Sequence, residues 1–136
     1  MRAISNLLFK FATSFDVKDW QGVEDTLADN IVCNYQDLRG EIKTYSKAEY
    51  VNSRAEVLNN LYTQHFFSNL EIDYHRNEAY CRLSAIIYRR DKEGSYFNSH
   101  VIYNFKLTKK SKNWKIKEIK QTVLWNEGDS IIHKGV

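Results

Sequence analysis

The sequence predicts an α+β fold in which N-terminal helices cover one face of a curved antiparallel sheet. Apolar residues repeat at helical spacing in parts of the first 60 residues and then alternate with a period of two over most of the remainder. Four strand-like segments follow one another through short turns, which is typical of an antiparallel meander. The 136 residues contain no proline, no repeat and no low-complexity linker, so we expect a single domain spanning residues 1–136.

The first half of the chain contains three predicted helices. Residues 4–15 place their apolar side chains on one stripe, and Asp19 is a plausible N-cap for a second, short helix. Ser46 followed by Glu49 forms the pattern of a capping box, which opens a third helix that runs to about residue 60. The buried stripe of this third helix is predicted to consist of Ala48, Val51, Ala55 and Leu58.

The strands are predicted from β-branched and aromatic runs bounded by turn residues. A short strand is expected at residues 30–35, and Gly40 marks a turn after it. The four long strands of the meander are expected at residues 63–75, 79–90, 96–109 and 114–125. Strands of this length must curve, and helices on the concave side would turn the sheet into a cone. The mouth of such a cone can hold a ligand.

The segment "TQHFFSN" carries polar groups on both faces of a predicted strand. Alternation places His65, Phe67 and Asn69 on one face, and Gln64, Phe66 and Ser68 on the other. A strand that only filled a core would not need these polar groups. We therefore expect one face to line the interior of the cone and the other to meet a second layer, such as another subunit.

Composition excludes several classes of function. No apolar run reaches the ~18 residues of a transmembrane helix, and the N-terminus lacks a signal-peptide cleavage site. Cys33 and Cys81 lie in apolar, strand-like contexts, so we expect two buried thiols in a reducing compartment and a cytoplasmic protein. The sequence has no metal-ligand spacing, phosphate loop or dinucleotide glycine pattern. We therefore expect no metal and no cofactor.

A lysine-rich stretch lies between Lys106 and Lys120, with Glu118 as its only acid. We interpret this stretch as a hairpin whose solvent face is basic. The alternative is a nucleic-acid-binding patch, but the stretch lacks interleaved glycines and arginines, and nucleic acid is not favoured as a partner.

Four motifs together resemble a known family. The motifs "SFDVKDW", "NYQDL", "TQHFFSN" and "LWNEGD" resemble, in order and separation, the SnoaL-like branch of the nuclear transport factor 2-like, or cystatin-like, superfamily. The resemblance is strongest to the scytalone dehydratases and covers nearly the whole chain. It implies a cone fold. It does not by itself imply one activity, because this fold hosts isomerases, cyclases, dehydratases, hydrolases and non-catalytic binding modules.

The resemblance also implies roles for individual residues. Asp16 matches a carboxylate that leans into the dehydratase pocket, and His65 matches one of two catalytic histidines. Tyr35 matches a tyrosine that holds a pocket water, and Asn104 matches an asparagine that hydrogen-bonds the substrate. Further ligand-binding positions are predicted at Phe15, Phe67, Arg89 and Trp125.

Two positions depart from the family pattern. Phe15 stands where the family has a tyrosine, which removes a hydroxyl group. The second catalytic histidine is replaced by Tyr88, Arg89 or Arg90. The family pattern pairs that histidine with Asp16. In this chain Asp16 then either lacks such a partner or forms an ion pair with Arg89.

Two functions are compatible with these residues. The first is a small-molecule lyase or isomerase, of dehydratase or cyclase type, that uses acid–base chemistry without a cofactor. His65 would act as base and then as acid, and Tyr35 would hold a water against a carbonyl. Asp16 would either orient the imidazole or, if apolar walls raise its pKa, act as a base itself. The alternative is a binding module that keeps the pocket for a small hydrophobic or aromatic molecule but has lost part of the catalytic set.

We also expect a homodimer formed through the sheet. The predicted outer face of the sheet carries aromatic side chains, some of which must be covered. The residues assigned to this face are Phe66, Tyr80, Tyr88, Phe97 and Tyr103.

Overall fold

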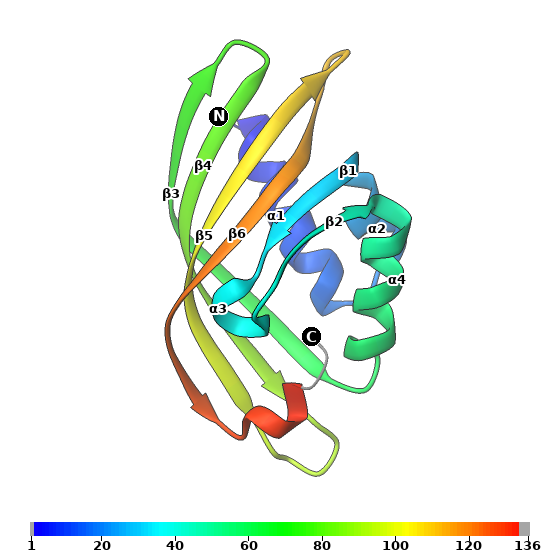
Figure 1. Cartoon of the computed structure of the whole chain (residues 1–136), viewed down its shortest axis with the longest axis vertical. Coiled ribbons are helices and arrows are strands. Elements are labelled where there is room, and N and C mark those ends of the chain that lie inside the picture. The colour runs from blue at the N-terminus through cyan, green and yellow to red at the C-terminus, as the bar shows by residue number, and fades with distance from the viewer. Residues whose placement is uncertain (1, 134–136) are drawn as a thin grey trace.

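The computed structural model describes the backbone of residues 2–133 and, apart from residues 38, 39 and 133, their side chains. Helices and strands follow the predicted order, helices mainly first and long strands after (Figure 1). The elements are α1 (Arg2–Asp16), α2 (Trp20–Asp25), β1 (Leu27–Asn34), α3 (Gln36–Arg39), β2 (Ile42–Ser46), α4 (Lys47–Leu58), β3 (Tyr62–His75), β4 (Glu78–Arg90), β5 (Phe97–Lys110), β6 (Asn113–Gly128) and the 3₁₀ helix η1 (Ser130–His133).

The six strands form one sheet in the order β2-β1-β6-β5-β4-β3. Strands β3 to β6 are antiparallel neighbours, which confirms the predicted meander. The prediction of a wholly antiparallel sheet is wrong at one place, because β1 pairs parallel with β6. Strand β2, which we did not predict, pairs antiparallel with β1. The pairing of β1 with a strand some 80 residues further along the chain leaves no local signal, since no turn joins the two.

The sheet bends around α1, as Figure 1 shows. Irregular pairing occurs along the long strands, between Ser68 and Glu71, between His100 and Val101, and between Lys106 and Leu107. Asn69 adopts a left-handed backbone conformation with φ of 55° at the first of these bulges. The bulge interrupts the alternation of β3. Asn69 is therefore exposed and does not share the inward face with His65 and Phe67, as we had predicted.

Helix α1 lies on the concave side and supplies much of the core. Its residues Ile4, Leu8 and Phe11 are almost completely buried. The ring of Phe11 meets that of Phe105 on β5 at 5.9 Å. Burial of each such side chain stabilises the fold by about 1.5–3 kcal/mol. The apolar stripe of this helix is therefore what holds it inside the curve of the sheet.

Side-chain caps fix the starts of α2 and α4. Asp19 accepts a hydrogen bond from the backbone N–H of Gly22 at 2.9 Å. The backbone N–H of Ser46 donates to Glu49 at 2.9 Å, and that of Glu49 donates to the Ser46 hydroxyl at 3.2 Å. Both predicted caps are confirmed.

The buried face of α4 differs from the prediction. Its buried residues are Tyr50, Val51, Arg54 and Leu58, whereas Ala48 is exposed and Ala55 is only half-buried. The helix is rotated because a tyrosine ring has far more apolar area to remove from water than an alanine methyl group. This rotation carries Arg54 into the interior of the protein.

Three further expectations concern the surface and the cysteines. Cys33 and Cys81 are both buried and are not joined in a disulfide. Among residues 2–133, no helix is long and apolar enough to cross a membrane. Several lysines of the basic stretch are close to acids, including Lys106, which lies 3.6 Å from Glu78 and 3.4 Å from Glu118.

The aromatic residues assigned to the outer face divide between the two faces. Phe66, Tyr80 and Tyr88 are substantially exposed there. Phe97 and Tyr103 are buried, so their assignment to the outer face was wrong. Phe97 and Tyr103 have the opposite parity on β5 from Asn98 and Asn104, and the odd-numbered residues of this strand face the core.

Candidate functional site

Asp16 and His65 form a closely bonded pair where α1 ends beside β3. Oδ1 of Asp16 lies 2.7 Å from Nδ1 of His65. Oδ2 of the same carboxylate accepts the backbone N–H of His65 at 2.8 Å, and the Thr63 hydroxyl donates to Oδ1 at 3.2 Å. Three contacts therefore fix the carboxylate. The alternative Asp16–Arg89 ion pair is not formed, because the carboxylate of Asp16 is engaged by His65.

This geometry determines which histidine nitrogen can act on a ligand. A carboxylate accepts hydrogen bonds only, so it selects the tautomer with the proton on Nδ1. Nε2 then carries the free electron pair, and it makes no hydrogen bond to any described residue. The side chains are 10% exposed for His65 and 16% for Asp16. The pair therefore places a general base where it is largely shielded from solvent.

His65 lines a small cavity in the interior of the cone. The cavity has a volume of about 50 Å³, whereas pockets for drug-sized ligands measure roughly 300–1,000 Å³. Its wall consists of Phe11, Phe15, Tyr35, Tyr50, Arg54, Leu58, Thr63, His65, Ile87, Arg89, Tyr103 and Gln121. Helix α1, helix α4 and four strands each contribute to this wall.

Buried tyrosines supply hydroxyl groups to the cavity. The hydroxyls of Tyr35 and Tyr50 lie 3.0 Å apart, and Nε2 of Gln121 donates to the hydroxyl of Tyr103 at 2.9 Å. Burial raises the pKa of all three tyrosines above the usual value of 10.0. They are therefore neutral phenols at physiological pH and able to donate hydrogen bonds.

Arg54 enters the cavity from α4 and is 3% exposed. Its guanidinium lies 4.7 Å from the ring of Tyr50 and 5.1 Å from that of Tyr35, so it is held by cation–π contacts. Nη1 donates to the Ser53 hydroxyl at 3.3 Å, whereas Nη2 is buried without a hydrogen-bond partner among the described residues. Sequence reasoning missed Arg54. The i, i+4, i+8 spacing of Tyr50, Arg54 and Leu58 could have revealed it.

Arg89 enters the cavity from β4 and is 4% exposed. Nη1 donates to the Ser99 hydroxyl at 2.9 Å and to the carbonyl oxygen of Phe97 at 3.4 Å. Burial lowers the pKa of Arg89 to about 10, so it is still charged at neutral pH. No described Asp or Glu forms an ion pair with either buried arginine.

The remaining predicted site residues lie at different distances from the cavity. Phe15 lines it, with its ring 5.7 Å from that of His65. Phe67 packs 6.2 Å from the His65 ring without lining the cavity. Asn104 is exposed on the opposite face of the sheet, and half-exposed Trp125 stacks on His100 at 4.0 Å. The expectation that Asn104 and Trp125 share a pocket with His65 is therefore wrong, because both side chains point to the outer side of their strands.

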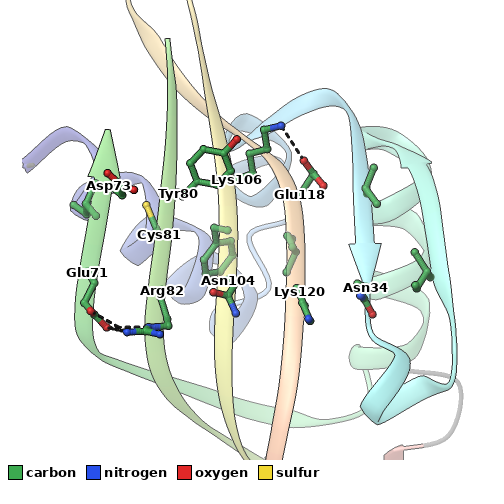
Figure 2. Close-up of a pocket in the computed structure, with 15 residues that line it drawn as sticks. Asn34, Glu71, Asp73, Tyr80, Cys81, Arg82, Asn104, Lys106, Glu118 and Lys120 are labelled. Atoms are coloured by element: carbon green, nitrogen blue, oxygen red, sulfur yellow. Dashed lines mark hydrogen bonds and ion pairs between the residues drawn. The ribbon is translucent and has the colours of Figure 1, made fainter. Parts of the chain in front are cut away.

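The outer face of the sheet has a wider hollow of about 690 Å³, in which Asn104 lies (Figure 2). Its charged groups include two ion pairs across neighbouring strands. Arg82 donates from Nε and Nη2 to the two carboxylate oxygens of Glu71, both at 3.0 Å, and Lys106 lies 3.4 Å from Glu118. The hollow is open to solvent and brings together no base comparable to His65.

A metal centre finds no support in the described part of the chain. Residues 2–133 bring together no group of three or more His, Cys, Asp or Glu side chains able to hold a metal ion. The acids and histidines instead form separate pairs, such as Asp16 with His65.

The family model described as "SnoaL-like domain" matches residues 1–120. Several solved structures share the fold. A proposed aromatic ring hydroxylase from Novosphingobium aromaticivorans is 20% identical, with a TM-score of 0.87 over 97% of this chain and 94% of that one. A proposed scytalone dehydratase from the same organism is also 20% identical, with a TM-score of 0.84 over 95% and 87%.

A third similar structure is a hexachlorocyclohexane dehydrochlorinase from Novosphingobium barchaimii. It is 11% identical, with a TM-score of 0.81 over 95% of this chain and 89% of that one. No curated protein matches the sequence significantly. At these identities the structures establish a shared fold, while their names describe different reactions.

Proposed function

The chain belongs to the SnoaL-like domain family, and on that premise we propose that it is a small-molecule lyase or isomerase of dehydratase or cyclase type. It uses acid–base chemistry and no cofactor. The observation that carries this proposal is the 2.7 Å contact between Asp16 and His65, with His65 at the wall of a buried cavity. Two of the similar structures are named for a dehydration and a dehydrochlorination, both of which are eliminations.

His65 is the base of the proposed elimination. Nε2 takes the proton from a carbon next to a carbonyl group, and the C–H electron pair moves into an enolate. Asp16 accepts the hydrogen bond from Nδ1 and stabilises the imidazolium that forms. Arg89 and the buried phenols, Tyr35 among them, face the enolate charge. The imidazolium then returns the proton to the leaving hydroxyl, the C–O bond breaks and water departs.

The size of the cavity restricts what reacts there. About 50 Å³ accepts the reacting end of a substrate and not a fused ring system. An open hollow of about 850 Å³ adjoins the cavity and shares Thr63 and Arg89 with it. Tyr62, Tyr88 and Tyr96 line this hollow. The apolar or aromatic remainder of a small substrate would lie against these rings.

The test is elimination or C–H exchange with a panel of β-hydroxy ketones, followed by NMR in D₂O. His65→Gln should lower the rate on any active substrate by about 10²–10⁴-fold, the usual contribution of a positioned acid–base group. His75→Gln is the matched control, because His75 also contacts a carboxylate, at 3.0 Å from Asp73, and neither residue lines the cavity or the open hollow. Equal rates for His65→Gln and the wild type would refute the proposal.

A non-catalytic binding module is the second candidate. Arg89 lies in the cavity wall where the family pattern calls for a second histidine, and Phe15 brings no hydroxyl to the same wall. Native mass spectrometry of protein purified from cells would detect a carried molecule. A bound molecule that is released unchanged, with no turnover of any panel member, would favour this candidate.

We also propose that two copies of the chain associate through the outer face of the sheet. Phe66 and Tyr88 pack edge to face at 5.7 Å there and remain 52% and 42% exposed. Exposed aromatic patches of this kind mark interfaces. Sedimentation equilibrium should give a dimer, and Phe66→Asp should shift it to monomer. A wild type that stays monomeric over the whole concentration range of the experiment would contradict the proposal.

A further inference from the structure

We propose that the cavity binds the carboxylate of a small hydroxy acid between Arg54 and Arg89. As a statement of substrate class, this inference rests on the proposed function, since His65 acts in the same cavity. As a binding site, it rests on three features of the cavity wall. Among the described residues, these are two buried cations without an acidic partner, donors without an acceptor, and an acceptor without a donor.

The charge of the cavity is the first feature. Arg54 and Arg89 are 3% and 4% exposed, and neither forms an ion pair with a described acid. The carboxylate of Asp16 bonds to His65 through both of its oxygens. Buried charges in proteins are normally paired, because an uncompensated one is strongly disfavoured. An anion in the cavity would supply the missing charge.

The unused donors are the second feature. Nη2 of Arg54 is buried, and no residue in the described part of the chain forms a hydrogen bond with it. Both described side-chain hydrogen bonds of Arg89 come from Nη1, so no described residue accepts a hydrogen bond from its Nε or Nη2. A guanidinium presents its donors in a planar fork that matches the two oxygens of a carboxylate. Two such forks on one cavity point to a carboxylate as the bound anion.

Gln121 adds the third feature. It is 4% exposed, and its Oε1 is buried without a partner among the described residues. Its Nε2 donates to the hydroxyl of Tyr103, so the phenolic proton of Tyr103 is still available to a ligand. Oε1 accepts hydrogen bonds only. A ligand that satisfies it must donate one, and a hydroxyl group on the acid does so.

The tyrosine cage around Arg54 does not account for these features. Rings of Tyr35, Tyr45 and Tyr50 lie between 4.7 and 5.8 Å from the guanidinium carbon and stabilise its charge. A ring face accepts no strong hydrogen bond, so Nη2 is still without a partner. The cage holds the guanidinium in place, and the volume of about 50 Å³ leaves room for a ligand of a few non-hydrogen atoms.

The test is direct binding by isothermal calorimetry and NMR titration at constant ionic strength. The probes are sodium acetate and sodium glycolate, with acetamide and glycolamide as neutral analogues of the same shape. We expect saturable binding of both carboxylates, tighter binding of glycolate than of acetate, and none of either amide. Equal binding of amide and carboxylate, or no binding of either carboxylate, would overturn the inference.

Variants assign the binding to the two arginines. Arg54→Met and Arg89→Met should each weaken glycolate binding by about 10-fold or more, since each removes a charge-assisted hydrogen bond. Arg82→Met is the matched control on the outer face and should leave the affinity unchanged. Wild-type affinity in both cavity variants would overturn the assignment. If a methionine variant fails to fold, Arg54→Lys replaces it, and the wild-type contrast between carboxylate and amide still decides.

His65→Gln separates this inference from the proposed function. Glycolate binding that persists in His65→Gln, with no turnover of any hydroxy acid or hydroxy ketone by the wild type, supports the anion site and refutes the enzyme. Turnover of neutral hydroxy ketones without any carboxylate binding refutes the anion site and leaves the enzyme intact.

Discussion

Arg82 and Arg89 lie on the same strand, β4, but on opposite faces of the sheet, and their charges are compensated differently. Arg82 is 60% exposed and makes two 3.0 Å hydrogen bonds to Glu71 (Figure 2). Arg89 is buried and forms no ion pair with a described carboxylate. Water already solvates the first arginine, so its pair contributes at most ~1 kcal/mol. The second is 4% exposed and forms no ion pair with a described acid, and this uncompensated charge is what indicates a ligand site.

Two histidine–carboxylate pairs give a second comparison between the same regions. Asp16–His65 is 2.7 Å long and lies against the cavity, whereas Glu127–His100 is 2.6 Å long and lies on the outer side, where Glu127 is 49% exposed. Their lengths are nearly equal. A short contact between histidine and carboxylate therefore does not define a site. The small cavity and the nearby donors distinguish the inner pair.

The largest expected effect comes from removing the carboxylate of each pair. Asp16→Asn should lower kcat/KM by ~100-fold or more, because the amide selects the wrong tautomer of His65 and no longer stabilises its charged form. Glu127→Gln should lower kcat/KM far less than Asp16→Asn does, since Glu127 lines only the open hollow and is absent from the wall of the small cavity. Steady-state rates of both variants on one active substrate test this. Equal losses in the two variants would remove the distinction between the pairs.

A smaller effect is expected from alkaline pH. Burial raises the pKa of Tyr35, Tyr50 and Tyr103 above 10.0, so above pH 10 the unfolded chain loses phenolic protons that the folded chain keeps. Their stabilising contribution is complete below pH 10 and is lost as pH rises, by up to about 1.4 kcal/mol per pH unit for each tyrosine. Arg89 acts in the opposite sense above pH 10, but one arginine does not offset three tyrosines.

Urea unfolding at pH 8, 9, 10 and 11 measures this effect. Tyr103→Phe should make the fall in unfolding free energy above pH 10 less steep, because phenylalanine has no phenolic proton for the unfolded chain to lose. A stability that is constant from pH 8 to pH 11 would show that the cavity tyrosines are not held as neutral phenols.

The smallest effect sharpens the comparison of the two arginines. Burial lowers the pKa of Arg89 to about 10, well below the usual value for arginine, and this disfavours its charged form by about 3 kcal/mol. Arg89→Met removes this penalty but also removes the bond to Ser99 and the contact with Phe97. Without ligand, we expect the variant to be about 1 kcal/mol more stable than the wild type.

Arg82→Met is the matched variant and should be less stable than the wild type, by at most ~1 kcal/mol. Unfolding free energies in urea, measured in a buffer free of carboxylates, give both values. The informative result is the sign. Destabilisation by Arg89→Met of several kcal/mol would mean that the guanidinium is needed to hold the fold and would weaken the argument for a ligand.

Much of the fold could be predicted because its signals are local. The stripe of α1, the capping box of α4 and the alternation in β3 to β6 each depend on residues a few positions apart. The parallel β1–β6 pair, the bulge at Asn69 and the rotation of α4 depend on distant contacts. Those contacts join residues far apart in the chain, and they form because the complete fold that contains them has the lowest free energy. No short window of sequence contains both partners.

The candidate site divides in a similar way. The resemblance of their motifs to those of a known family identified Asp16, Tyr35 and His65. The cavity is lined by Phe15, Tyr35, His65 and Arg89, and Asp16 lies beside it, bonded to His65. Trp125 was misplaced because β6 has an extra residue between Val123 and Trp125, which changes its face. Asn104 was misplaced because the regular alternation of β5 does not itself tell which set of side chains faces the core. Arg54 and Gln121 were missed because a lone arginine on a helix or a lone glutamine on a strand is usually solvated.

By itself, the sequence determined which segments become helices and strands, because periodicity selects the face that each segment removes from water. It also determined that an acid and a histidine exist at positions 16 and 65. Only the tertiary structure decided that Asp16 bonds to His65 and not to Arg89, and that two arginines enter one cavity without a carboxylate. The physical reason is that the choice of partner for a buried charge depends on which groups the closed sheet places within a few ångströms, and that distance is set by packing of the whole chain.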